Sequence, residues 1–172
     1  VTDSDALDGA QMQRLQSANV PLVGDRRESL MHNKFVVIDS AVVWTGSLNL
    51  TGSGTYKDDN NFLRILSEDL AQNYTTEFEE MFVDDEFGNG SPSNTPNPQV
   101  TLADGTPLEN YFSPDDDISP RLVDVLEAAD RSIHFLAYSF TSDPIADVLL
   151  EQARAGVTVR GVFDEGSYRS NT

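Results

Sequence analysis

Apolar residues in the first part of the chain follow two different spacings, which predict both helices and strands. Residues 5–18 place leucine and methionine near helical spacing and predict an amphipathic helix. Two continuous apolar runs, 35–38 and 41–44, predict a buried β-hairpin, and a third run at 62–66 predicts a further strand. From Ser67, a residue type that favours the N-cap of a helix, apolar side chains recur about every four positions and predict a second helix.

The pattern changes in the middle of the chain and then resumes in a different order. Residues 84–110 are rich in Gly, Pro, Ser, Asn and Asp and show no period, which predicts a linker or a long surface loop. Beyond it the spacings predict a helix with Pro120 at its first position, a strand at 132–140, a helix at 144–155 and a strand at 157–163. This alternation favours an α/β fold in which helices flank a parallel sheet.

The charge of the chain limits its partners. The 172 residues include 29 Asp and Glu against 11 Lys and Arg, a formal net charge of −18. Such a surface repels phosphate backbones at long range, so it disfavours nucleic acid as a partner, and it is typical of a surface adapted to solubility or to a saline habitat. The sequence has no cysteine and no apolar run of membrane-spanning length, which excludes disulfides and predicts no transmembrane segment.

One stretch carries a pattern of candidate catalytic and anion-binding residues, H-x-K-x4-D-x6-G-S-x-N. Its members are His32, Lys34, Asp39, Gly46, Ser47 and Asn49. On a strand, residues two apart project from the same face, so we expect the imidazole and the ammonium to lie side by side. The end of the partner strand returns a hydroxyl and an amide. This set suits a phosphodiester, because cationic and neutral donors stabilise its oxygens while a nucleophile attacks in line.

Each of these residues alone has an ordinary structural explanation, but six fixed types recur by chance only about 10⁻⁸ times per start position. The pattern resembles the HKD motif of the phospholipase D superfamily. That resemblance implies that His32 is a nucleophile forming a phosphohistidine, that Lys34 and Asn49 bind the phosphate oxygens, and that Ser47 assists. It implies a structural role for Asp39, and it implies neither a metal nor another cofactor.

One position departs from the family. Members often carry a Glu-Asn pair after the motif, where this chain has Asn60 and Asn61. An amide can accept a hydrogen bond from an imidazole but cannot stabilise its positive charge as a carboxylate does, so the tuning of His32 is expected to differ. His134 has Leu136 rather than lysine two residues later, and we interpret it as a structural histidine.

The second half resembles the opening of a phospholipase D domain at Tyr111 to Pro114, at 132–141 and at 156–160. We therefore expect residues 1–83 to be the closing half of such a domain, with the HKD motif, 84–110 to be a linker, and 111–172 to be an opening half. The order indicates an excised fragment. The implied fold is an α-β-α sandwich with a mixed, largely parallel sheet, formed as a circular permutant or a domain-swapped dimer, because neither half can bury its own sheet.

Family members generally join two HKD motifs, so the resemblance implies a homodimer or a second HKD half to complete the site. The leading hypothesis is a phosphodiesterase or transphosphatidylase of phospholipase D type, acting on a phospholipid or another phosphodiester. The alternatives are an HKD-family endonuclease on DNA or RNA and, in a different class, a catalytically incomplete assembly module. The resemblance also favours a location at the bacterial envelope or outside the cell.

Overall fold

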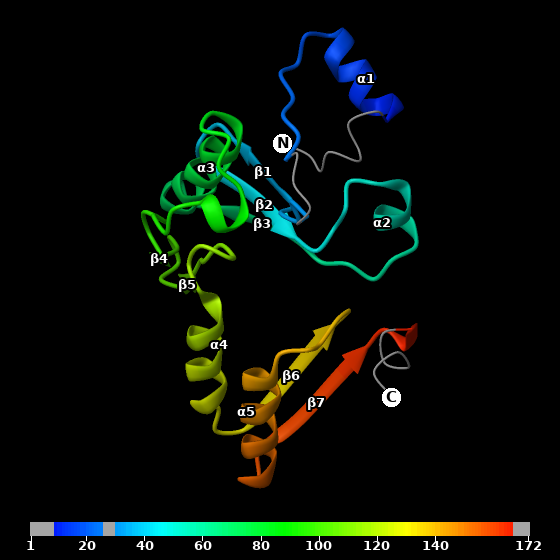
Figure 1. Ribbon diagram of the computed structural model, residues 1–172. Coiled ribbons are helices and arrows are strands. Elements are labelled where there is room, and N and C mark those ends of the chain that lie inside the picture. The colour runs from blue at the N-terminus through cyan, green and yellow to red at the C-terminus, as the bar shows by residue number, and fades with distance from the viewer. Residues whose placement is uncertain (1–8, 26–29, 167–172) are drawn as a thin grey trace. The chain divides into compact units, whose positions relative to one another are not determined.

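The computed structural model describes residues 9–25 and 30–166. The chain divides into two compact units, Val1–Asp116 and Asp117–Thr172, which are drawn in Figure 1. None of the helices in these described stretches is long and apolar enough to cross a lipid bilayer.

The first unit consists of a three-stranded sheet, a long helix and several short elements (Figure 1). They are α1 (Ala10–Ser17), β1 (Phe35–Ile38), β2 (Val42–Gly46), α2 (Gly52–Tyr56), β3 (Phe62–Leu66), α3 (Glu68–Phe82), a 3₁₀ turn η2 (Gly88–Gly90), β4 (Gln99–Thr101) and β5 (Pro107–Glu109). The predicted hairpin, the third strand and the helix that follows Ser67 are confirmed. The Ser67 side chain caps α3 by accepting a hydrogen bond from the Leu70 N–H at 3.2 Å.

The core of this unit lies between the sheet and α3. The strands run in the order β1-β2-β3 and pair antiparallel. In this register Val37, Val43 and Ile65 stand side by side on one face, where they pack with the buried Leu70 and Ala71 of α3. Alternation along the strands leaves the other face apolar and exposed. On this outer face Val36, Ile38 and Leu66 are between 39% and 63% exposed.

Residues 84–110, whose composition predicts a linker or a long surface loop, are folded onto α3. β4 and β5 pair antiparallel, and Val100 is buried. The fully buried Asn73 of α3 donates to the Asn97 carbonyl at 2.7 Å and to Asn110 Oδ1 at 3.0 Å, and its own Oδ1 accepts from the Asn97 N–H at 2.8 Å. Side-chain amides thus fix a segment that has no hydrophobic period, and the first compact unit extends to Asp116.

The second unit repeats the predicted order of helix, strand, helix and strand. Its elements are α4 (Ile118–Glu127), β6 (Ser132–Ala137), α5 (Asp143–Arg154) and β7 (Thr158–Phe163). The helix α4 begins two residues before Pro120, which is therefore its third residue rather than its first. β6 and β7 pair parallel, with Ser132 opposite Thr158.

The architecture is mixed α/β, as the sequence predicts, but its sheets are not mainly parallel. Within the described residues, parallel pairing is confined to β6 and β7, and the other two sheets are antiparallel. The reason is local, because a tight turn joins β1 to β2 and leaves no crossover connection between them. Asp39 and Ser40 form this turn with φ of 53° and 51°.

Candidate active site

The histidine and the lysine of the motif lie at the wall of a large cavity. They stand in a segment without regular secondary structure, which leads into β1 at Phe35. His32 is exposed and Lys34 is half-buried, and both line a cavity of about 810 Å³. The prediction placed both side chains on a strand. They precede the strand instead, and both line the cavity.

The remaining walls of the cavity come from distant parts of the first unit. They are formed mainly by the end of β2, the cavity-facing side of α3, and the stretches 87–91 and 111–115. The fold of residues 84–116 onto α3 therefore supplies part of the cavity wall. A linker without fixed structure would have left His32 and Lys34 on an open surface.

The Lys34 ammonium is held beside the backbone of His32. Its Nζ donates a hydrogen bond to the His32 carbonyl oxygen at 2.6 Å. Partial burial lowers the pKa of Lys34 from its ordinary value. An ammonium has three donors, so two remain for an anion in the cavity while this contact persists.

Gly46 is the motif residue of β2 that reaches the cavity wall. Its Cα faces the backbone of Asn61, which precedes β3, and a methyl group at Gly46 would collide with the Asn61 carbonyl oxygen. Ser47, next in the chain, donates its N–H to that same oxygen at 3.1 Å. Glycine is required here because the two backbones approach so closely.

Ser47, Asn49 and Asn60 are not among the residues that line the cavity. The Ser47 hydroxyl donates to Asn60 Oδ1 at 2.9 Å and accepts from the Asn61 N–H at 3.1 Å. Asn60 in turn donates to the Gly54 carbonyl at 3.1 Å. This network ties the end of β2 to the start of β3, and the structure does not bring it to His32.

Two further residues singled out in the sequence are also not among those that line the cavity. Asp39 is exposed in the β1–β2 turn, at the opposite end of β1 from Lys34, where a short polar side chain tolerates the left-handed backbone. His134 is exposed on β6, opposite Arg160 of β7, in the second unit.

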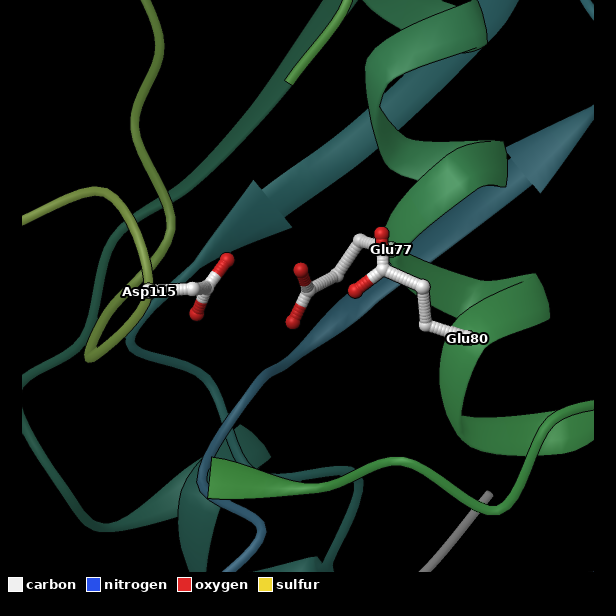
Figure 2. A group of neighbouring side chains, drawn as sticks. All are labelled: Glu77, Glu80 and Asp115. Carbon is white, nitrogen blue, oxygen red and sulfur yellow. The ribbon is translucent and has the colours of Figure 1, made fainter. Parts of the chain in front are cut away.

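An acidic group that the sequence analysis missed faces the same cavity. Glu77 of α3 lines it, is 4% exposed, and accepts a hydrogen bond from Asn33 Nδ2 at 2.9 Å. Asp115 lines it as well. Glu80, one helical turn after Glu77, is 5% exposed. Figure 2 shows the three carboxylates directed toward one another.

Burial and the charges of neighbouring acids raise the pKa of all three carboxyl groups. For Glu77 burial has the largest effect, followed by the charges of Asp115 and Glu80, and its pKa rises to about 8 although the Asn33 hydrogen bond opposes the shift. Burial is also the main reason that the pKa of Glu80 and that of Asp115 are raised. Near neutral pH, Glu77 is thus predominantly protonated unless a positive charge approaches it.

The periodicity of α3 contained a signal for two of these acids. The apolar spacing predicts an inner face with Phe78 and Phe82, but these rings are half-buried and stack on each other at 5.0 Å. Glu77 and Glu80 continue the spacing of the buried Leu70 and Asn73 and lie on the inner face instead. Asp115 stands in a run of three acidic residues before a predicted helix, a pattern typical of a solvated loop, yet the structure places it at the cavity.

Comparison with known proteins identifies the part of the chain that carries the motif. A family model described as "Cardiolipin synthase, PLD-like domain" matches residues 3–82. These residues are therefore similar to the phospholipase D superfamily. We call them the phospholipase D segment.

Curated relatives match nearly the same stretch. The mitochondrial cardiolipin hydrolase of Xenopus tropicalis is 38% identical over 84 residues, which cover 48% of this chain and 40% of that protein. The human mitochondrial cardiolipin hydrolase is 33% identical over 84 residues, 48% of this chain and 33% of that protein. A phospholipase D of Rickettsia conorii is 31% identical over 65 residues, 38% of this chain and 32% of that protein. The match thus spans two fifths or less of the length of these relatives.

The cavity extends beyond the phospholipase D segment. His32, Lys34, Gly46 and Glu77 lie within the segment, whereas the wall formed by 87–91 and 111–115 follows it in the chain. The family match therefore accounts for the motif and for α3, and the fold of this particular chain adds the residues that cover them.

Proposed function

We propose that the chain is a phosphodiesterase of phospholipase D type, in which His32 attacks phosphorus and Lys34 binds its non-bridging oxygens. The observation that carries the proposal is that His32 and Lys34 line one cavity within the phospholipase D segment. A cavity of about 810 Å³ is large enough for a lipid head group.

The proposed reaction has two displacements. An imidazole nitrogen of His32 attacks phosphorus in line, the bond from phosphorus to the leaving alcohol oxygen breaks, and a general acid protonates that oxygen. The phosphohistidine then reacts with water, which loses a proton to the same group, and the phosphorus–nitrogen bond breaks to restore the imidazole. An alcohol in place of water gives transphosphatidylation.

Ser47 and Asn49 belong to the proposal as further phosphate ligands, on the basis of their motif positions. Gly46 lies at the cavity wall, and Ser47 and Asn49 follow it in the chain by one and three residues. Asn60 has a different proposed role from the one expected, because its Oδ1 accepts a hydrogen bond from the Ser47 hydroxyl. We infer that it positions Ser47 rather than the ring of His32.

A phospholipid is the substrate class that the comparisons favour. The named relatives are cardiolipin hydrolases and phospholipases D, whereas the net charge of −18 opposes a long polyanion such as DNA or RNA. The general acid is proposed to be a second histidine, supplied by a second copy of this chain or by another HKD segment.

We also propose that residues 1–83 and 111–172 are the closing and opening halves of phospholipase D domains, which together form a sandwich with a mixed sheet. In support, each unit exposes apolar residues of its own sheet, including Leu66 in β3 and Leu136 in β6. Pairing within one chain gives a circular permutant, and pairing between chains gives a swapped dimer.

Trapping the covalent intermediate tests the proposed function. Incubation with vesicles that contain ³²P-labelled phospholipid, followed by alkaline denaturation, is expected to leave acid-labile phosphate on the protein. The His32→Ala variant should lose this label, and the control His134→Ala, which changes an exposed histidine of the second unit, should keep it. Labelling that survives His32→Ala would contradict the proposal, and labelling by DNA alone would favour the endonuclease.

A further inference from the structure

Three acidic residues from two parts of the fold bring their carboxylates together at the cavity. Glu77 and Glu80 project from one face of α3, and Asp115 approaches from the loop that follows β5 (Figure 2). One oxygen from each carboxylate lies within 4.8 Å of the other two. The charges of Asp115, Glu80 and Asp116 raise the pKa of Glu77. Those of Asp115, Glu86 and Asp116 raise the pKa of Glu80, and that of Asp116 raises the pKa of Asp115.

A second observation is that one buried carboxylate oxygen of this cluster has no hydrogen-bond partner. Glu80 is only 5% exposed, and its Oε2 has no hydrogen-bond partner, although the side chain of Asn94 hydrogen-bonds to the same carboxylate. A buried carboxylate oxygen without a partner destabilises the folded state, because it has lost its hydration and no hydrogen bond or cation replaces the lost water. Figure 2 shows the Glu80 carboxylate directed toward those of Glu77 and Asp115.

We propose that Glu77, Glu80 and Asp115 bind one Ca²⁺ ion. Carboxylate oxygens are the ligands that hard divalent cations prefer. Ca²⁺ binds oxygen at about 2.3–2.6 Å, so two of its ligand oxygens lie at most about 5 Å apart, whereas the shorter bonds of Mg²⁺ limit that distance to about 4.2 Å. The oxygens of this cluster all lie within 4.8 Å of one another, which is inside the limit for Ca²⁺, and three carboxylates exceed the one or two that usually hold Mg²⁺. Water from the cavity, which Glu77 and Asp115 line, completes the coordination.

The positive charge of the proposed ion also offsets the repulsion among the three carboxylates. Burial and repulsion raise the pKa of the three carboxyl groups, so near neutral pH a proton is held where the ion would bind. Ca²⁺ binding should displace that proton. This inference is independent of the proposed phosphodiesterase activity, because it concerns binding by residues that take no part in the phosphoryl transfer.

Isothermal titration calorimetry of the whole chain with CaCl₂, after treatment with a chelator, tests the proposal. We expect saturation at one ion per chain, with a Kd between about 10⁻⁶ and 10⁻³ M, and proton release seen as a dependence of the heat on the buffer. Glu80→Gln should weaken binding at least about 10-fold. The matched control Glu79→Gln removes the same charge from an exposed position of α3 and should leave the affinity unchanged.

Several results would overturn the proposal. They are the absence of saturable heat, binding that Glu80→Gln leaves intact, an equal loss in Glu79→Gln, and tighter binding of MgCl₂ than of CaCl₂. Thermal unfolding keeps the test valid if a variant folds poorly. Without Ca²⁺, Glu80→Gln should leave the Tm unchanged or raise it, because a buried unpaired charge is removed, yet it should abolish the rise in Tm that Ca²⁺ causes. A lowered Tm without Ca²⁺ would mean that Glu80 Oε2 already has a stabilising partner, which also contradicts the proposal.

Discussion

Glu77 is the residue whose ionisation links the cavity to the stability of the first unit. It is buried, it faces two other acids, and its pKa is raised from 4.5 to about 8. The folded state therefore binds a proton that the unfolded chain has already lost above its ordinary pKa. By linkage, the free energy of unfolding falls as the pH rises from about 4.5 to about 8 and levels off above that range.

This gives a prediction for protein kept free of divalent cations with a chelator. The Tm should decrease between pH 5 and pH 8, and Glu77→Gln should flatten the decrease, because a neutral amide has no proton to lose. Gln retains an oxygen that can accept from Asn33. The exposed Glu79→Gln should reproduce the wild-type profile when Tm is followed by circular dichroism. A profile that Glu77→Gln leaves as steep as before would assign the pH dependence to other groups.

At the same scale, some site residues could be found from the sequence and others could not. His32 and Lys34 are separated by one residue, so their spacing alone predicts that they act together. Glu77 and Asp115 are far apart in the chain, and they meet only because the stretch after α3 folds back over it. No spacing rule covers a contact that depends on a loop.

At the scale of elements, apolar periodicity was sufficient to predict each helix or strand that packs through a hydrophobic face. The hairpin of β1 and β2, the strand β3 and the helix α3 all follow from apolar spacing. The hairpin of β4 and β5 does not, because buried side-chain amides rather than an apolar stripe hold it to α3. Asparagine and proline in that stretch predict turns equally well in a mobile linker and in a fixed loop.

Replacing Asn73 tests how firmly this segment is held. Asn73→Ala removes three hydrogen bonds and leaves the Asn97 backbone without its partners, so we expect a loss of about 2–4 kcal/mol in the free energy of unfolding measured in urea. Gln72→Ala removes an exposed contact to the same Asn97 and should change stability by less than about 0.5 kcal/mol. If both variants are neutral, residues 84–110 behave as the linker that their composition suggests.

At the scale of the whole molecule, the open question is what covers the exposed sheet faces. In β6 the side chain of Leu136 is 81% exposed, and in the β2–β3 connection that of Leu50 is 74% exposed. The proposed pairing of the two halves treats these residues differently. Leu136 belongs to a sheet face that pairing would cover, whereas Leu50 belongs to a loop. Substituting a charge at each therefore separates a covered face from a free surface.

If the halves pair, Leu136→Asp should lower the free energy of unfolding by about 2 kcal/mol or more, because it places a carboxylate in an apolar layer. Leu50→Asp should cost no more than about 0.5 kcal/mol. Equal, small effects would mean that β6 stays exposed and that the halves do not share a sandwich.

Light scattering during size-exclusion chromatography then distinguishes the two arrangements, since a circular permutant has the mass of one chain and a swapped dimer that of two. A dimer that Leu136→Asp converts to monomer would place the exchange at this face, and it would give each His32 a symmetry-related partner for the proposed acid–base step.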